Sequence, residues 1–195
     1  MVSVQAQIPV LSSKGSASAE SSLGSYVADA VRLAAKADVA VVPSSLLRDV
    51  DIPADKLTAQ AVQDALMDSG QNIAVLVITG AQLRDAIERS VGLYPRPNAG
   101  FLQVSGITFR FEPSAKQGER LGEITINRRP VSPDQSLRVA MPASLASGAL
   151  GYFRVWGDVK PTDEKPGTIG KAIESFLASE INLEEYAQPG RIRKI

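Results

Sequence analysis

Three aspartates, Asp49, Asp51 and Asp55, stand close together and are the grouping in this sequence that could suggest a metal site. Carboxylates at such spacing supply oxygen ligands to Ca²⁺ in calcium-binding loops. Those loops also need a glycine at the sharp turn and a glutamate at the end, and this stretch has neither. The spacing therefore does not predict a calcium site.

Two residue types that carry much of enzyme chemistry are missing, because the sequence contains no His and no Cys. Without histidine there is no Ser-His-Asp catalysis, and a zinc or iron site would have oxygen ligands alone. Without cysteine there is no disulfide, thiolate metal site or cysteine nucleophile. We therefore expect no catalytic residue, no metal site and no cofactor in this chain.

Bulk properties set the class of protein. The 195 residues are enough for one domain with a sizeable core and too few for two full-sized domains. Lys plus Arg and Asp plus Glu both number 21, so the net charge of zero gives no general attraction to nucleic acid or an anionic membrane. No apolar run is long enough to span a bilayer, and residues 1–10 lack the pattern of a signal peptide.

Hydrophobic spacing predicts the elements of the first half. Apolar and polar residues alternate over 2–10, as in a short strand or lead-in segment. Unbroken apolar runs at 40–42 and 73–78 predict buried strands. Helices are expected over 22–36 with Ser21 or Ser22 as N-cap, over 57–67 with Thr58 as N-cap, and from Thr79, where Thr79 and Gln82 match a capping box.

The second half is richer in strands, which are predicted at 101–104, 107–111, 123–127 and 137–141 between turn residues, before a last helix over 168–178. Helices come first and mostly antiparallel strands follow. This order predicts the α+β class, as one domain with a mixed, mostly antiparallel sheet packed with helices. We expect residues 1–16 to be a lead-in strand or linker and residues 17–195 to be the domain.

Several segments resemble one family when they are taken in order. Residues 20–30 (ESSLGSYVADA) resemble the Glu-(Ser/Thr)-Asn-Leu-Gly-Asn-Leu-Ile-Ala-Asp-Ala opening of the 5'-nucleotidase C-terminal domain. Residues 78–91 (ITGAQLRDAIERSV), 100–106 (GFLQVSG) and 145–152 (LASGALGY) are similar to its Leu-Thr-Gly-Ala-Gln-Leu-Arg helix, its Phe-Leu-Gln-Val-Ser-Gly strand and its Leu-Ala-Asn-Gly-Gly-Asp-Gly-Phe loop. Residues 189–192 look like its ending, so the resemblance covers roughly 17–192.

The resemblance implies a division of labour between two domains. In complete enzymes of this family a metallophosphoesterase domain precedes this one and holds two divalent metals, which activate water and neutralise phosphoryl charge. The C-terminal domain binds the nucleoside part of the substrate. A chain without histidine cannot supply the metal ligands of the first domain. We therefore expect the substrate-binding half without the catalytic half.

The residues that contact substrate in the family are mostly replaced here. The loop that usually reads Asn-Gly-Gly-Gly-Ile-Arg is Pro43 to Arg48 (PSSLLR), and without its glycines we expect a different loop shape. The two aromatic residues that stack on the base are missing, since residues 66–70 contain no ring and Ser144 stands at the second position. Leu150 replaces the ribose-binding aspartate, and residues 15–19 lack the upstream arginine.

Of the family's substrate contacts, Arg48 alone stays in place. It is our one candidate substrate-binding residue, as an anion contact left from the substrate site. The alternative is a surface arginine, or one paired with Asp49 or Asp51. Six further matching residues are interpreted as structural, in capping, tight turns and close packing: Glu20, Gly24, Asp29, Gly80, Gly106 and Gly151.

Two functions follow as hypotheses. The first is a non-catalytic ligand-binding or interaction module with a degenerate nucleotide pocket, for a nucleotide-like or other anionic small molecule, and inactive as an enzyme on its own. The second is the substrate-binding part of a nucleotide-hydrolysing enzyme, in nucleotide catabolism, whose metallophosphoesterase domain lies elsewhere or on a separate chain. The resemblance also implies a periplasmic or extracellular location.

Overall fold

The structure is a computed structural model that describes residues 10–179 and 181–195. Its helices are α1 (Ser22–Ala34), α2 (Ala59–Asp64), α3 (Gly80–Val91), α4 (Ala143–Ala146), α5 (Phe153–Trp156) and α6 (Ile169–Leu177). Its strands are β1 (Val10–Ser12), β2 (Val39–Pro43), β3 (Asp51–Pro53), β4 (Ile73–Thr79), β5 (Leu102–Ser105), β6 (Thr108–Phe111), β7 (Leu121–Ile126), β8 (Arg129–Pro130), β9 (Ser136–Pro142) and β10 (Ile192–Lys194). Single 3-10 turns lie at η1 (Ser44–Leu46), η2 (Ala54–Lys56), η3 (Ala149–Gly151) and η4 (Leu183–Tyr186).

A central sheet in the order β4-β9-β2-β5 divides the molecule into two cores. Along β2, Val39 and Val41 face one core while Ala40 and Val42 face the other. Both faces of this sheet are therefore covered, which explains why β2 and β4 are unbroken apolar runs rather than alternating ones. The strand pairs are antiparallel except for β2 with β9, as expected for a mixed, mostly antiparallel sheet.

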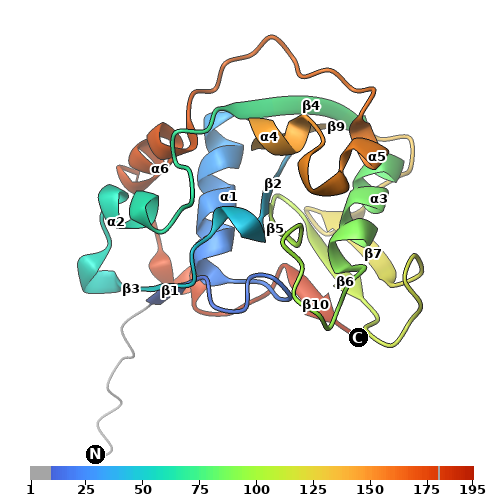
Figure 1. Cartoon of the computed structure of the whole chain (residues 1–195), viewed down its shortest axis with the longest axis horizontal. Coiled ribbons are helices and arrows are strands. Elements are labelled where there is room, and N and C mark those ends of the chain that lie inside the picture. Colours follow the sequence, from blue (N-terminus) through green and yellow to red (C-terminus); the bar gives the residue numbers. More distant parts are fainter. Residues whose placement is uncertain (1–9, 180) are drawn as a thin grey trace, which may run out of the picture.

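Helices α1, α2 and α6 cover one face of the central sheet, and α3 with a second sheet covers the other (Figure 1). The second sheet has the order β10-β6-β7-β8. Helix α1 is buried along most of its length, and Leu23, Val27 and Val31 are fully enclosed. The architecture confirms the predicted α+β class.

Most of the predicted elements are present with shifted ends. Ser21 caps α1, Thr58 caps α2, and Thr79 with Gln82 forms the predicted capping box of α3. Helix α2 stops at Asp64 rather than at residue 67. Beyond its end, backbone groups of Ala65 and Met67 bond to the segment after β2 instead of continuing the helix. Of the strand or lead-in predicted over 2–10, only Val10 lies within the described residues.

The matching glycines are sites of close approach, which confirms their interpretation as structural. A Cβ at Gly24 would lie 2.4 Å from the Gln103 side chain, and one at Gly80 would lie 2.0 Å from the Ser132 carbonyl oxygen. At Gly106 the backbone is left-handed, with φ of 82°, and a Cβ would lie 2.1 Å from the carbonyl oxygen of Asp38. Larger residues at these positions would force the sheet and its helices apart.

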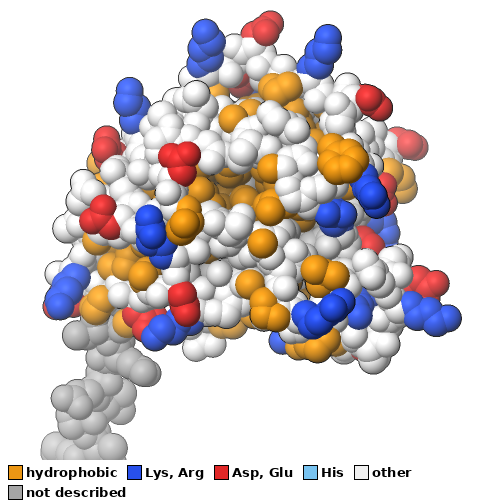
Figure 2. Space-filling model, in the orientation of Figure 1, with side chains coloured by type: hydrophobic (Ala, Val, Ile, Leu, Met, Phe, Trp, Pro, Cys, Tyr) orange, Lys and Arg blue, Asp and Glu red, His pale blue; other side chains and the backbone are white. Residues whose placement is uncertain are grey.

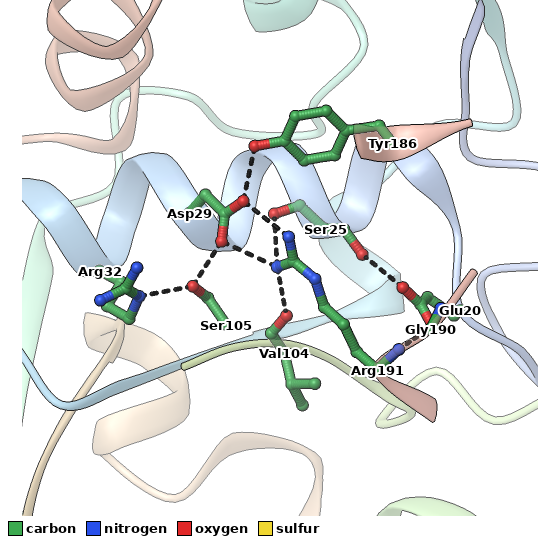
Figure 3. A network of polar contacts seen from close by, with 9 residues as sticks. All are labelled: Glu20, Ser25, Asp29, Arg32, Val104, Ser105, Tyr186, Gly190 and Arg191. Atoms are coloured by element: carbon green, nitrogen blue, oxygen red, sulfur yellow. Dashed lines mark hydrogen bonds and ion pairs between the residues drawn. The ribbon is translucent and has the colours of Figure 1, made fainter. Parts of the chain in front are cut away.

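Asp29 of α1 forms the centre of a polar network that holds the end of the chain (Figure 3). The Arg191 guanidinium grips its carboxylate with two bonds, Nη1 to Oδ1 at 2.8 Å and Nη2 to Oδ2 at 2.7 Å. The hydroxyls of Ser105 and Tyr186 also donate to Asp29. Arg191 Nη1 donates further to the Val104 carbonyl at 3.0 Å, so the ion pair joins α1, β5 and the C-terminal segment.

Glu20 completes this attachment. Its Oε2 accepts bonds from the backbone N–H groups of Gly190, Arg191 and Ile192 at 2.9, 2.7 and 2.9 Å. The residues that follow form β10, which pairs in parallel with β6 in the second sheet. Glu20 and Asp29 are therefore structural, as their place in the matching motif suggested, and they position the end of the chain rather than a ligand.

The buried ion pair should make stability sensitive to acid. Burial alone would raise the pKa of Asp29, but hydrogen bonds and charge from Arg191, with the Ser105 and Tyr186 hydroxyls, outweigh it and hold that pKa below its usual range. A lowered pKa in the folded state gives stability that is present above the unfolded value of about 4 and lost as pH falls through the folded value.

We predict that Asp29→Asn lowers the free energy of unfolding by about 3 kcal/mol at neutral pH, because it leaves the Arg191 charge buried and uncompensated. Chemical denaturation at pH 7 and at pH 3 measures this. The difference between variant and wild type should shrink at the lower pH. Asp51→Asn is the matched control, since Asp51 pairs with Lys14 in an exposed position. An equal loss in both variants would contradict the assignment.

Candidate functional site

The segments expected to contact a ligand meet at one end of the central sheet. Strands β2 and β9 are parallel and both end there, while β5 and β4 are antiparallel to them and begin there. We call this end the loop edge, made of residues 43–48, 65–72, 98–101 and 142–152. Backbone bonds connect its parts: Ser44 N to Phe101 O at 2.8 Å, Met67 N to Leu46 O at 2.8 Å, and Ala143 N to Asn72 O at 2.8 Å.

The turn after β2 is held in place by contacts that its own side chains make with neighbouring segments. Residues 44–46 form a 3-10 turn, and none of residues 43–48 has the left-handed backbone that favours glycine. The buried Ser44 hydroxyl donates to the Asn98 carbonyl at 2.8 Å, and Leu46 packs into the core below α1. The turn contributes an apolar plug, Leu46, and uses no left-handed backbone, which is how a segment without glycine folds.

Arg48 lies on the surface at the loop edge. Its backbone N–H donates to the Ala65 carbonyl at 2.8 Å and its Nε donates to the Leu66 carbonyl at 3.1 Å. Within the described residues no carboxylate lies within 4.0 Å of its guanidinium, and Asp51 pairs with Lys14 instead. The guanidinium is thus oriented by a backbone contact, and the residue is exposed.

No aromatic side chain lies at residues 66–70 or at Ser144, the two positions that match the family's base-stacking residues. The Ser144 hydroxyl and its backbone N–H both donate to Oε1 of Gln71, the latter at 3.1 Å. This polar link ties α4 to the segment before β4. Met67 is the exposed large apolar side chain of residues 65–72, with 58% of its surface accessible. The loop edge therefore has no aromatic clamp at residues 66–70 or at Ser144.

The loop after α4 keeps an unusual backbone. Gly148, Leu150 and Gly151 have φ of 91°, 58° and 80°, all in the left-handed region. The Leu150 carbonyl accepts a bond from Arg89 Nη2 at 2.5 Å, and a Cβ on Gly151 would lie 2.1 Å from the same nitrogen. The Leu150 side chain is 38% exposed and offers no polar atom. Arg89 and the two glycines thus hold the loop in shape without an aspartate.

A cavity of about 260 Å³ lies beside this loop, between Arg89, Leu93, Asn98, Leu150 and Tyr152. Tyr152 is fully buried, its ring stacks on Trp156 with centroids 4.9 Å apart, and its hydroxyl donates to the Gly100 carbonyl at 2.7 Å. Burial raises the pKa of Tyr152 far above its usual value, so the phenol stays protonated. Both rings are packed in the core.

Figure 2 shows the molecule in the orientation of Figure 1, in which α4 lies near the top. Hydrophobic side chains gather near the middle of this face, and charged side chains stand mainly around its margin. The described residues contain no group of three or more His, Cys, Asp or Glu able to hold a metal ion. Within residues 10–179 and 181–195, no helix combines the length and apolarity that a membrane crossing requires.

Comparison with known proteins agrees with the order of the motifs. The family model described as "5'-nucleotidase, C-terminal domain" matches residues 3–156. A 5'-nucleotidase of Vibrio parahaemolyticus is 27% identical over 176 residues, which are 89% of this chain and 30% of that protein. A snake venom 5'-nucleotidase of Naja atra is 30% identical over 102 residues, 48% of this chain and 19% of the relative. The chain thus spans less than a third of the length of these curated relatives.

Solved structures show the same fold. A 5'-nucleotidase precursor from Thermus thermophilus superposes with a TM-score of 0.79 and 20% identity, over 97% of this chain and 40% of that one. The sulfate thiohydrolase SoxB, also from Thermus thermophilus, superposes with a TM-score of 0.69 and 17% identity, over 96% of this chain and 34% of that one. Because the family model covers most of the chain and these folds agree, this chain belongs to the 5'-nucleotidase C-terminal domain family.

Proposed function

We propose that this domain is a non-catalytic ligand-binding or interaction module whose nucleotide pocket is degenerate. One observation carries the proposal: Ser144 hydrogen-bonds Gln71 at the position where the resemblance implies a base-stacking ring. The fold around it is intact, since the chain superposes on a 5'-nucleotidase precursor with a TM-score of 0.79. On this proposal, the ligand-contacting side chains have changed while the elements that position them have not.

The energetic consequence is a weak nucleoside site. Stacking of a base on an aromatic side chain contributes about 1–3 kcal/mol. Losing two rings would therefore weaken nucleoside binding about a hundredfold or more, since about 1.4 kcal/mol corresponds to tenfold. Leu150 adds to this loss because a leucine cannot accept a hydrogen bond from a ribose hydroxyl.

The fold is compatible with nucleotide hydrolysis and with other roles. SoxB, described as a sulfate thiohydrolase, shares this fold at a TM-score of 0.69. A common scaffold hosts different functions, and the function depends on the side chains at the site. We propose that the ligand here is a small anion or an anionic small molecule, contacted by the exposed Arg48 guanidinium.

The second candidate function is substrate binding within a nucleotide-hydrolysing enzyme. Its support is the Arg48 guanidinium, which is oriented by the Leu66 carbonyl and has no carboxylate within 4.0 Å in the described part of the chain. A metallophosphoesterase domain, in the same protein or on another chain, would supply the metals and the water activation. This function would place the protein in nucleotide catabolism, and for either function we propose a location outside the cytoplasm.

We predict that AMP and adenosine stabilise the wild-type chain weakly, and that a Ser144→Phe, Leu150→Asp double variant binds them about tenfold or more tightly than wild type. The ring restores one stacking surface and the carboxylate restores a ribose contact. Isothermal titration measures the affinities. Leu33→Asp is the control, because Leu33 is an exposed leucine on α1 away from the loop edge. Strong binding of AMP by the wild type would contradict a degenerate pocket.

A separate prediction tests whether the chain is catalytic on its own, which neither candidate function expects. The purified chain should release no phosphate from AMP in the presence of Mg²⁺ or Mn²⁺, because its described residues provide no metal-binding cluster. Colorimetric phosphate assay measures this. Metal-dependent release that persists after repurification would overturn the non-catalytic assignment.

Arg48→Gln separates anion binding from simple surface charge. If the Arg48 guanidinium meets the anion, the variant should weaken AMP binding about tenfold, since hydrogen bonds to charged groups contribute about 1.5–3 kcal/mol. Arg154→Gln, another exposed arginine, is the matched control and should leave the affinity nearly unchanged. Equal effects in both variants would remove Arg48 from the site.

A further inference from the structure

A second candidate site lies on the outer face of the second sheet, and it is independent of the loop edge. Strands β6, β7 and β10 bury one set of side chains against α3 and the central sheet. The alternate side chains point outward and line a groove of about 390 Å³: Thr108, Arg110, Glu123, Thr125, Arg128 and Arg193. A groove of this size matches the lower range of small-molecule sites.

Three arginines line this groove together with Glu123, and none of the three forms an ion pair within the described residues. Arg193 and Arg110 are register neighbours in the parallel pair of β10 and β6, so both side chains stand on the same face. Arg193 Nε donates to the Gly190 carbonyl at 3.1 Å. Within the described residues no carboxylate lies within 4.0 Å of Arg110, Arg128 or Arg193. Like charges placed side by side on a sheet are destabilising, and a bound anion would relieve their repulsion.

Polar groups of the right kind complete the groove. Thr108 and Thr125 are opposite one another in the antiparallel pair, with their hydroxyl oxygens 2.7 Å apart. One of these hydroxyls can donate to an oxyanion while the other donates to its neighbour. Glu123 also lines the groove and can accept hydrogen bonds from hydroxyl groups of a ligand. The groove therefore offers donors to an anion and an acceptor to a polyol.

The backbone at Arg128 provides a further indication. Asn127 and Arg128 join β7 to β8 with φ of 49° and 64°, as in the two-residue turn that favours Asn followed by Gly. Arginine at the second position is a strained choice, because a non-glycine residue rarely has positive φ. The strain places a third guanidinium at the mouth of the groove, and strain of this kind is often found at functional sites.

We propose that this groove binds the phosphate or sulfate ester group of a small hydroxylated molecule. The guanidinium groups of Arg110, Arg128 and Arg193 contact the oxyanion, since their planar forks match its oxygens. Thr108 or Thr125 donates one more hydrogen bond, and Glu123 accepts from a hydroxyl of the ligand body. Anion binding here requires neither a nucleobase nor the residues of the loop edge.

The test is an NMR titration of the ¹⁵N-labelled chain with inorganic phosphate, glucose 6-phosphate and glucose. We expect glucose 6-phosphate to shift amides of β6, β7 and β10 more strongly than inorganic phosphate does, and glucose alone to shift none. Arg110→Gln should weaken glucose 6-phosphate binding about tenfold. Arg129→Gln, the same change one residue beyond the turn and outside the groove, should leave it nearly unchanged.

Arg128→Gly separates binding from folding. Glycine suits the left-handed backbone, so the variant should melt at the same temperature as wild type or higher, while it binds glucose 6-phosphate several-fold more weakly. The proposal is overturned if glucose 6-phosphate shifts no amide of these strands. It is also overturned if Arg129→Gln weakens binding as much as Arg110→Gln, which would indicate diffuse charge attraction.

Discussion

The ion pair between Asp29 and Arg191 is the constraint on which the arrangement of this domain depends. Asp29 lies on α1, in the core on one side of the central sheet, while Arg191 immediately precedes β10, which belongs to the sheet on the other side. The side chains of Asp29 and Arg191 are 14% and 24% exposed, so the pair is shielded from competition by water. By gripping the Val104 carbonyl as well, Arg191 attaches the end of the chain to both layers at once.

The sequence predicts the local elements well and the long-range ones poorly. The capping box at Thr79 and Gln82 and the apolar faces of α1 and α3 are determined by residues three or four apart, so periodicity finds them. Strand β10 has three residues, and its place is set by a partner strand more than 80 residues earlier. The motif around residues 20–30 indicated that Asp29 is structural, but nothing local shows that Arg191 is its partner.

The same distinction applies to the loop edge. The differences from the family motif at Ser144 and Leu150 can be seen in the sequence, because each is one residue at one position of the motif. The contacts that these two residues make instead cannot be predicted from the sequence. The Ser144–Gln71 link joins residues 73 positions apart, and the bond from Arg89 to the Leu150 carbonyl joins residues 61 apart. The shape of the loop is held by backbone contacts and glycines, so it does not depend on the Leu150 side chain.

Backbone strain at two bulky residues has different meanings at the two candidate sites. At Leu150 the left-handed conformation belongs to a loop in which Gly148 and Gly151 are also left-handed and the Leu150 carbonyl is held by Arg89, and the side chain contributes no polar contact. At Arg128 the neighbours impose less, because a two-residue turn accepts glycine at that position without loss of pairing. The left-handed backbone at Leu150 is explained by the contacts of the surrounding loop. At Arg128 a glycine would adopt the same backbone without strain, so we look for a role of the arginine side chain. On the two proposals above, Leu150 stands where a ligand contact is lost and Arg128 stands where one is gained.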